Sequence, residues 1–151
     1  MANTPRWMLA LPLTCLLVGC ASAETPWVEL KGKRFAIEIA DDDAERARGL
    51  MFRDAMAADH GMLFIHDSEG PQSYWMKNTK IPLDILYFDN ARKLVAQQRD
   101  VPPCSAGDGC PPYPSKAPAR YVLELNAGEA ARLKLQNGAE LVFSKDIPAQ
   151  P

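Results

Sequence analysis

The stretch IPLDILYFD, residues 81–89, decides the fold, because it is the strongest strand signal in the chain. Side chains alternate between the two faces of a strand. Ile81 and the odd-numbered residues after it share one face, and Pro82, Asp84, Leu86 and Phe88 share the other. Both faces are mainly apolar, so the stretch predicts a strand that is covered on both sides, as in a barrel or a helix-covered sheet.

The flanking segments supply partners for this strand. A turn at residues 90–92 leads into the polar and apolar alternation of residues 93–101, which predicts a hairpin. Two strands joined at Lys31-Gly32 are expected within residues 25–42, and further strands at residues 61–67, 72–78, 120–128 and 139–144. Asp42 followed by Glu45 has the spacing of a capping box and predicts a short helix over residues 42–51. A second short helix is expected at residues 128–135, and the proline-rich residues 102–118 are expected to form a long structured loop.

Seven or eight short strands with one or two short helices predict a mainly β (α+β) fold, a small barrel-like antiparallel sheet. A two-layer α+β sheet is the alternative. The length suits one domain, which we place at residues 27–146, after a tether at residues 20–26 and before a C-terminal tail at residues 147–151.

The N-terminus has the features of a lipoprotein signal peptide at residues 1–19. Arg6 precedes an apolar run that ends in Leu17-Val18-Gly19-Cys20, and this run is too short to span a bilayer. The final four residues resemble the bacterial lipobox, which implies lipidation of Cys20. Cleavage after the A-x-A sequence of residues 21–23 is the alternative, and both predict export. Ala21 beside the lipidated cysteine resembles outer-membrane lipoproteins, so we expect the periplasmic face of the envelope, with a lipid anchor as the only membrane contact.

Charge and cysteine usage agree with this compartment. Removal of residues 1–19 leaves 16 basic and 19 acidic residues, and this balance argues against a nucleic-acid partner. Cys104 and Cys110 are separated by five small or turn-forming residues, so a disulfide is expected in an oxidising compartment. Metal binding by these thiols is the rival, but two further ligands would be needed and none lies close by in sequence.

Asp84 is the sharpest polar signal, because it lies among apolar residues on its strand face. A buried carboxylate needs a compensating partner. The candidates are Arg53, Lys77, Lys80 and the backbone N–H groups of residues 77–80. The carboxylate either fixes this turn, contacts a ligand in a pocket, or acts as a general acid or base.

The residues before this strand predict a binding surface. Trp75 and Met76 lie on opposite faces of a strand, so one is expected in the core and the other at a surface or cleft. Lys77 and Asn78 add a cation and an amide beside the tryptophan, and the amide suits either a turn or a ligand.

Two other functions are alternatives, a copper site and a hydrolase-like enzyme. Met51, Met62 and Met76, with His60 and His66, could form a periplasmic copper site because thioethers suit the cuprous ion, although methionine is also a common core residue. A hydrolase-like enzyme would use Asp84 as its acid or base. The sequence has no nucleophile motif, phosphate loop or HExxH motif, so no catalytic residue, metal or cofactor is predicted.

Four segments identify a family resemblance: RARGLMFR, GMLFIH, YWMKNTKIPLDILYFD and YVLELNAG. They resemble the successive signatures of domain of unknown function 192 (DUF192), from about Phe35 to Val142. The resemblance implies a small barrel-like β domain with a short helix, and it implies no activity.

Arg48, Arg53, Trp75, Asn78 and Asp84 belong to these matched signatures. Together with Lys77 they are the predicted ligand-binding residues. We expect the helix at 42–51 to pack on the strand at 81–89, with Arg48 or Arg53 neutralising Asp84. The predicted function is therefore binding of a small polar ligand or an envelope partner protein at the surface between Trp75 and Asp84.

Overall fold

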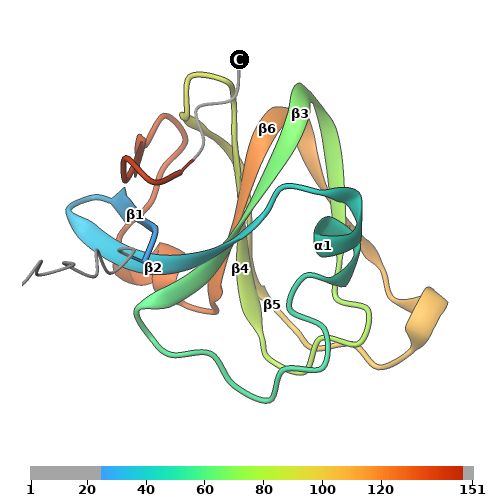
Figure 1. Ribbon diagram of the computed structural model, residues 1–151. Helices are drawn as coiled ribbons and strands as arrows, with labels where there is room; N and C mark the ends of the chain where they lie inside the picture. Colours follow the sequence, from blue (N-terminus) through green and yellow to red (C-terminus); the bar gives the residue numbers. More distant parts are fainter. Residues whose placement is uncertain (1–24, 148–151) are drawn as a thin grey trace, which may run out of the picture.

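The computed structural model describes residues 25–147, so the predicted signal peptide, Cys20 and residues 148–151 lie outside the described part of the chain. Seven strands form one curled sheet in the order β5-β4-β6-β3-β2-β1-β7 (Figure 1). The strands are β1 (Trp27–Leu30), β2 (Lys33–Ala40), β3 (His60–Trp75), β4 (Leu83–Phe88), β5 (Leu94–Val101), β6 (Pro112–Asn126) and β7 (Leu141–Phe143). The helices are α1 (Asp43–Arg48) and α2 (Glu129–Arg132), with a 3-10 turn η1 (Gly107–Gly109). The predicted mainly β, barrel-like fold is confirmed.

Strand β4 is covered on both faces, as its sequence predicts. It lies between β5 and β6, and all six of its side chains are buried. Leu86 and Phe88 join a first core cluster that draws side chains from all seven strands and α2. Ile85 and Tyr87 join a second core cluster on the opposite face, with Leu50 from the segment after α1. The alternation of apolar side chains on β4 therefore builds two cores from one strand.

Strands β3 and β6 form a long ribbon that folds back over the second core cluster. Residues 61–65 of β3 pair with residues 121–125 of β6, and after a register shift residues 70–75 pair with residues 112–119. The ribbon turns over at the top of Figure 1. The Phe64 and Tyr74 rings consequently meet edge to face, with centroids 4.9 Å apart.

This ribbon corrects two expectations from the sequence. The two strands expected at residues 61–67 and 72–78 are one bent strand. Residues 112–118, expected to be a loop, belong to β6. Proline lacks a backbone donor and is tolerated only at edges and bulges of sheets. The irregular pairing around Pro114 and Pro118 meets that condition.

Strands β2 and β3 are parallel, so the sheet is not wholly antiparallel as expected. A parallel pair needs a crossover connection, and α1 begins this one. Asp42 caps the helix by accepting a hydrogen bond from the Glu45 N–H at 2.8 Å. Gly49 ends it in a backbone conformation with φ of 46°, which glycine adopts without strain. The helix is thus shorter than the predicted residues 42–51.

The predicted packing of this helix on the strand at 81–89 is wrong. Helix α1 lies beside β2, and the Arg46 guanidinium donates to the Ile65 carbonyl of β3 at 2.7 Å. In the described residues, no helix is long and apolar enough to cross a membrane.

The predicted disulfide is present between Cys104 and Cys110, whose Cα atoms are 6.0 Å apart. The backbone of Cys104 also forms isolated β-bridges with the backbone of Lys77 and of Thr79. The cysteine loop is therefore attached to the turn that follows β3.

Candidate functional site

Asp84 is fully buried at 0 % exposure, but its partners are not the predicted ones. One carboxylate oxygen accepts the Asp100 N–H of β5 at 2.8 Å, and the other accepts the Ala130 N–H of α2 at 2.7 Å. No arginine, lysine or residue of the 77–80 turn is bonded to it among the described residues. The prediction that Arg48, Arg53, Lys77, Lys80 or the backbone N–H groups of residues 77–80 compensate this charge is wrong. The compensating backbone N–H groups come from β5 and α2 instead.

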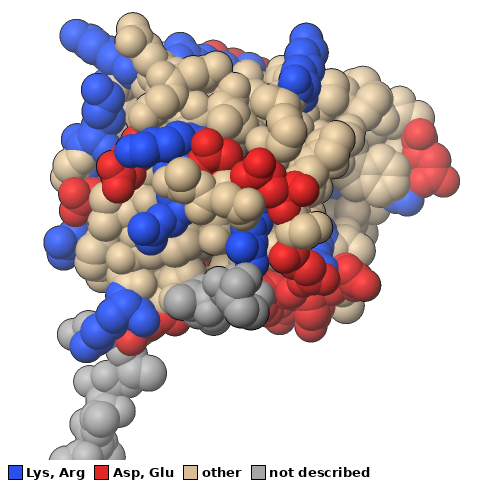
Figure 2. Space-filling model, turned by 90° about the horizontal axis from the view of Figure 1, so that it is seen from above, with Lys and Arg blue, Asp and Glu red and all other residues tan. Residues whose placement is uncertain are grey.

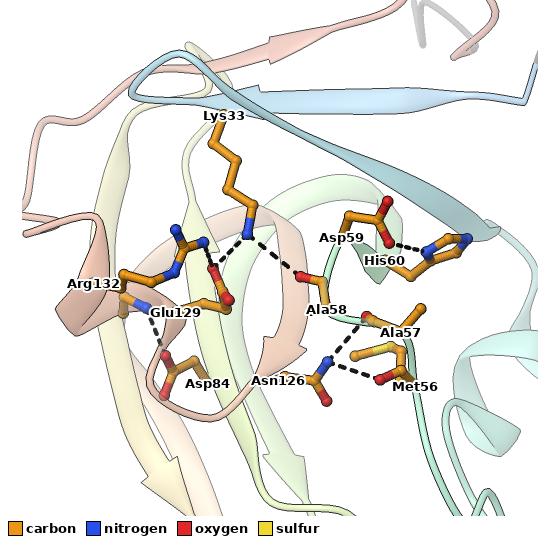
Figure 3. Close-up of polar contacts among 11 residues, drawn as sticks. Lys33, Met56, Ala57, Ala58, Asp59, His60, Asp84, Asn126, Glu129 and Arg132 are labelled. Atoms are coloured by element: carbon orange, nitrogen blue, oxygen red, sulfur yellow. Dashed lines mark hydrogen bonds and ion pairs between the residues drawn. The ribbon is translucent and has the colours of Figure 1, made fainter.

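The basic side chains near Asp84 pair with the carboxylate of Glu129 instead. Lys33 and Arg132 both contact Glu129, the Lys33 Nζ at 3.0 Å (Figure 3). Burial raises the pKa of Glu129, but the hydrogen bonds from Arg132 and Lys33 outweigh it and lower that pKa overall. Nearby, the Asn126 amide donates to the carbonyls of Met56 and Ala57, both at 3.0 Å. This end of the sheet is a joint that holds α2 and the α1–β3 connection in place.

The position of Asp84 also argues against the hydrolase-like alternative, in which Asp84 would be the acid or base. Asp84 faces the first core cluster with Leu86, both of its oxygens are bonded, and it lines none of the described cavities. A carboxylate in this position cannot reach a substrate, so it is a structural residue.

The other predicted site residues lie in separate surroundings. Arg53 makes a two-pronged ion pair with Glu38, and the hydrogen bond from Arg53 lowers the pKa of Glu38. Asn78 has a φ of 55° and its carbonyl accepts the Phe52 N–H at 2.8 Å. Asn78 thus serves a turn that connects with the segment after α1.

Trp75, Lys77 and Arg48 come together at a hollow beside α1. Trp75 is 43 % exposed, and its neighbour Met76 is fully buried, which confirms that one faces the core and one the surface. The Lys77 Nζ lies 4.8 Å from the centre of the Trp75 ring and pairs with Asp108 of the cysteine loop. Arg48 forms no ion pair with any residue from 25 to 147, so it is available at the rim.

Arg48, Trp75 and Lys77 line a small cavity there, and Trp75 also lines a larger hollow beside α1, which we call the α1 cleft, with a volume of about 450 Å³. Helix α1 forms one wall with Asp43 and Arg46, and the folded-back part of β3 forms the other with Ser73, Tyr74 and Trp75. Arg46 is fixed by its bonds to Asp43 and to the carbonyls of Asp41 and Ile65. The cleft therefore has rigid, mostly polar walls and one large aromatic surface.

A smaller cavity of about 30 Å³ lies next to the α1 cleft and shares Arg46, Tyr74 and Trp75 with it. Glu124 of β6 lines this cavity and is only 4 % exposed. Its strand neighbours across the sheet are Met62 and Ile85, so it faces the second core cluster. No hydrogen bond or ion pair joins its carboxyl group to any other side chain or backbone group in residues 25–147.

Burial without a partner raises the pKa of Glu124 to about 8. Desolvation disfavours the charged form of a carboxyl group, so Glu124 is mostly protonated at pH 7. Burial likewise raises the pKa of Tyr74 and lowers the pKa of His66, and these two side chains are joined at 3.0 Å. The wall of the cleft therefore contains neutral groups that both donate and accept hydrogen bonds.

Sequence reasoning did not select Glu124. The signal was nevertheless present, because the segment YVLEL is apolar on both faces apart from this residue. The same argument that selected Asp84 applies to Glu124, but strand periodicity does not say which buried acid faces a cavity.

Met51 and Met62 of the copper alternative line one cavity, but neither histidine lines it with them. His60 and His66 lie six positions apart on β3, which is about 20 Å along a strand. His60 is bonded to Asp59 at 2.8 Å, and Met62 and Met76 are buried in the second core cluster. No group of three or more histidine, cysteine or acidic residues suited to a metal occurs in the described chain.

Comparisons with known proteins place this architecture in a family. The model of the DUF192 family, described as "Uncharacterized ACR", matches residues 27–143. A solved structure from Sinorhizobium meliloti 1021, described as a candidate transcription regulator, is 36% identical with a TM-score of 0.72, covering 78% of this chain and 92% of that one. A protein of unknown function from Novosphingobium aromaticivorans DSM 12444 is 34% identical with a TM-score of 0.69, covering 77% and 81%. No curated protein matches. The chain belongs to the DUF192 family.

Proposed function

We propose that this DUF192 member is an exported envelope protein, anchored through lipid on Cys20, that binds a small polar ligand in the α1 cleft. The observation that carries the binding role is the exposed Trp75 beside a rigid polar hollow. Concave sites with an aromatic surface and a few convergent polar groups are the usual form of small-ligand sites.

The shape of the site favours a small ligand over a partner protein. The α1 cleft is an open hollow between α1 and the folded-back part of β3, and Trp75 lines its wall. A protein interface of ordinary size would need about 800 Å² on each partner with several clustered apolar anchors. Phe52 and Val142 are the other large apolar side chains exposed in residues 25–147, and neither lines the cleft.

The structural neighbour's description as a transcription regulator does not transfer on this geometry. Helices α1 and α2 have six and four residues, and both are too short to act as recognition helices in a major groove. Acidic and basic side chains alternate over the face in Figure 2, and a group of acidic side chains lies at its lower right. That face therefore lacks the basic stripe that nucleic-acid binding needs.

Export and anchoring rest on the N-terminal sequence. Leu17-Val18-Gly19-Cys20 supports lipidation, and the disulfide between Cys104 and Cys110 suits an oxidising compartment. Mass spectrometry of protein from the membrane fraction tests the anchor. We expect a mature chain that begins at Cys20 and carries acyl mass. A chain that begins at Glu24 without acyl mass would contradict the anchor and leave export intact.

Ligand binding is tested with the intact mature protein in a thermal-shift screen of small polar compounds. Compounds that raise the melting temperature of the wild type should lose that effect in Trp75→Ala. Trp27→Ala is the matched control, because Trp27 is the other tryptophan of the described chain and does not line the α1 cleft. Equal shifts in wild type and Trp75→Ala for every active compound would place binding elsewhere.

A further inference from the structure

The small cavity next to the α1 cleft is lined by Glu124, whose carboxyl group has no role in the binding site proposed above. Glu124 is only 4 % exposed, it lines a cavity, and no group in residues 25–147 is bonded to its carboxyl group. No fully buried side-chain oxygen or nitrogen of these residues lacks a partner, so the carboxyl oxygens of Glu124 are accessible from the cavity. A buried polar group is almost always hydrogen-bonded. An unpaired carboxyl group that faces a cavity therefore marks a place where a polar group from outside the chain is bound.

The size of the cavity limits that group. A volume of about 30 Å³ holds one water-sized group. A hydroxyl group fits this space, whereas a carboxylate or a phosphate does not. The cavity opens beside Trp75, so a ligand whose hydroxyl reaches Glu124 would lie against the indole ring.

The surrounding charges disfavour a cationic group. The titratable side chains around Glu124 are Arg46 and Arg48 of α1, Tyr74 of β3, Lys77 of the turn after β3, and Tyr87 of β4. The three basic side chains among them would repel an ammonium group. A neutral carboxylic acid both donates and accepts, which matches the hydrogen-bonding capacity of a hydroxyl group.

From this arrangement we propose that Glu124 forms a hydroxyl-binding subsite in the small cavity next to the α1 cleft and that the ligand is a neutral carbohydrate. Trp75 supplies the apolar surface for one face of the sugar ring. Asp67, Ser68, Gln72 and Ser73, which line the cleft, supply donors and acceptors for the remaining hydroxyl groups. This inference rests on the proposed binding function and names its substrate class.

The experiment uses the mature protein from the membrane fraction, kept in a polyoxyethylene detergent because glycoside detergents would compete. Glucose, N-acetylglucosamine and their short β-1,4- and α-1,4-linked oligomers are titrated by calorimetry. We expect at least one of them to bind the wild type. Glu124→Leu should weaken its binding about tenfold or more, as expected for one buried hydrogen bond. Glu140→Gln is the control, because Glu140 is exposed and pairs with Lys93 outside the cleft.

A second variant separates direct contact from a structural role. Glu124→Gln keeps a neutral donor and acceptor, so its affinity at about pH 6 should stay within about threefold of the wild type. Wild-type affinity should fall above about pH 8 as Glu124 ionises, and the Gln variant should lack this fall. Unchanged sugar binding in Glu124→Leu would overturn the subsite.

A parallel titration with malate, citrate and inorganic phosphate distinguishes the two proposals. Binding of these anions that depends on Trp75, without binding of any sugar, would overturn the carbohydrate inference and leave the proposed function standing. No binding from either panel would count against both.

Discussion

Asp84 and Glu124 are both buried acids on central strands, but they lie on opposite faces of the same sheet. Asp84 faces the first core cluster, where two backbone N–H groups from β5 and α2 satisfy its oxygens. Glu124 faces the second core cluster and a cavity, and no group of residues 25–147 satisfies it. The bonded acid holds the fold together, and the unbonded acid costs stability and is available for binding. Burial alone therefore does not mark a candidate functional carboxyl group, whereas burial without a bonded partner makes Glu124 such a candidate.

The largest expected effect comes from removing the bonded acid. Asp84→Ala leaves the Asp100 and Ala130 N–H groups unpaired, and each buried unpaired donor costs about 1–3 kcal/mol. We expect the free energy of unfolding to fall by about 4 kcal/mol in urea titrations. Asp84→Asn retains one acceptor oxygen and should lose about half as much. A loss below about 1 kcal/mol for Asp84→Ala would contradict the anchoring role.

The second effect is a pH dependence that belongs to Glu124 alone. Its pKa in the folded state, about 8, lies above the ordinary value of 4.5. Between these values the folded state binds more protons than the unfolded state, so stability is highest below about pH 4.5 and falls as pH rises toward 8. Glu124→Gln should remove this fall, and its stability advantage over the wild type should reach about 4 kcal/mol at pH 8.

Urea titrations of both proteins at matched pH values measure this difference, and contributions from all other groups cancel in the comparison. A difference that stays constant with pH would show that Glu124 titrates normally.

Glu124→Leu is expected to raise the free energy of unfolding, by a smaller amount than Asp84→Ala lowers it. The substitution replaces an unpaired buried carboxyl group with an apolar side chain in an apolar cluster. We expect a gain of about 1–2 kcal/mol at pH 5, where Glu124 is protonated. Thermal melting checks the sign. A loss of stability would mean that the carboxyl group has a structural partner after all.

The smallest effect tests whether cations matter to either acid. Arg53→Met removes an exposed ion pair with Glu38 and leaves Asp84 untouched. Exposed pairs contribute about 0–1 kcal/mol, so the melting temperature should change little. A loss as large as that of Asp84→Ala would restore the idea that Arg53 compensates Asp84.

Much of the fold could be read from the residues. The alternation in residues 81–89 gave β4 and its two buried faces, and the Asp42 and Glu45 spacing gave the start of α1. The cysteine spacing gave the disulfide. The bend in β3, the strand in residues 112–118 and the parallel β2–β3 pair were not predicted. Pairing between distant segments overrides local signals such as proline, and local patterns do not encode which strands meet.

The candidate site was likewise predicted only in part from the sequence. Trp75, Lys77 and Arg48 were selected from the sequence and lie together beside α1, whereas Arg53, Asn78 and Asp84 are engaged elsewhere. Glu124 was missed.

The sequence by itself determined the apolar alternation of the central strand and the start of the first helix, because periods of two and 3.6 are local properties of the chain. Only the tertiary structure decided what each buried acid meets, because the groups that reach Asp84 come from residues 16 and 46 positions away. The cavity at Glu124 likewise forms between α1 and the far ends of a folded-back ribbon. Hydrogen bonding and cavities depend on distances of a few ångströms between such remote segments, and no pattern along the chain contains those distances.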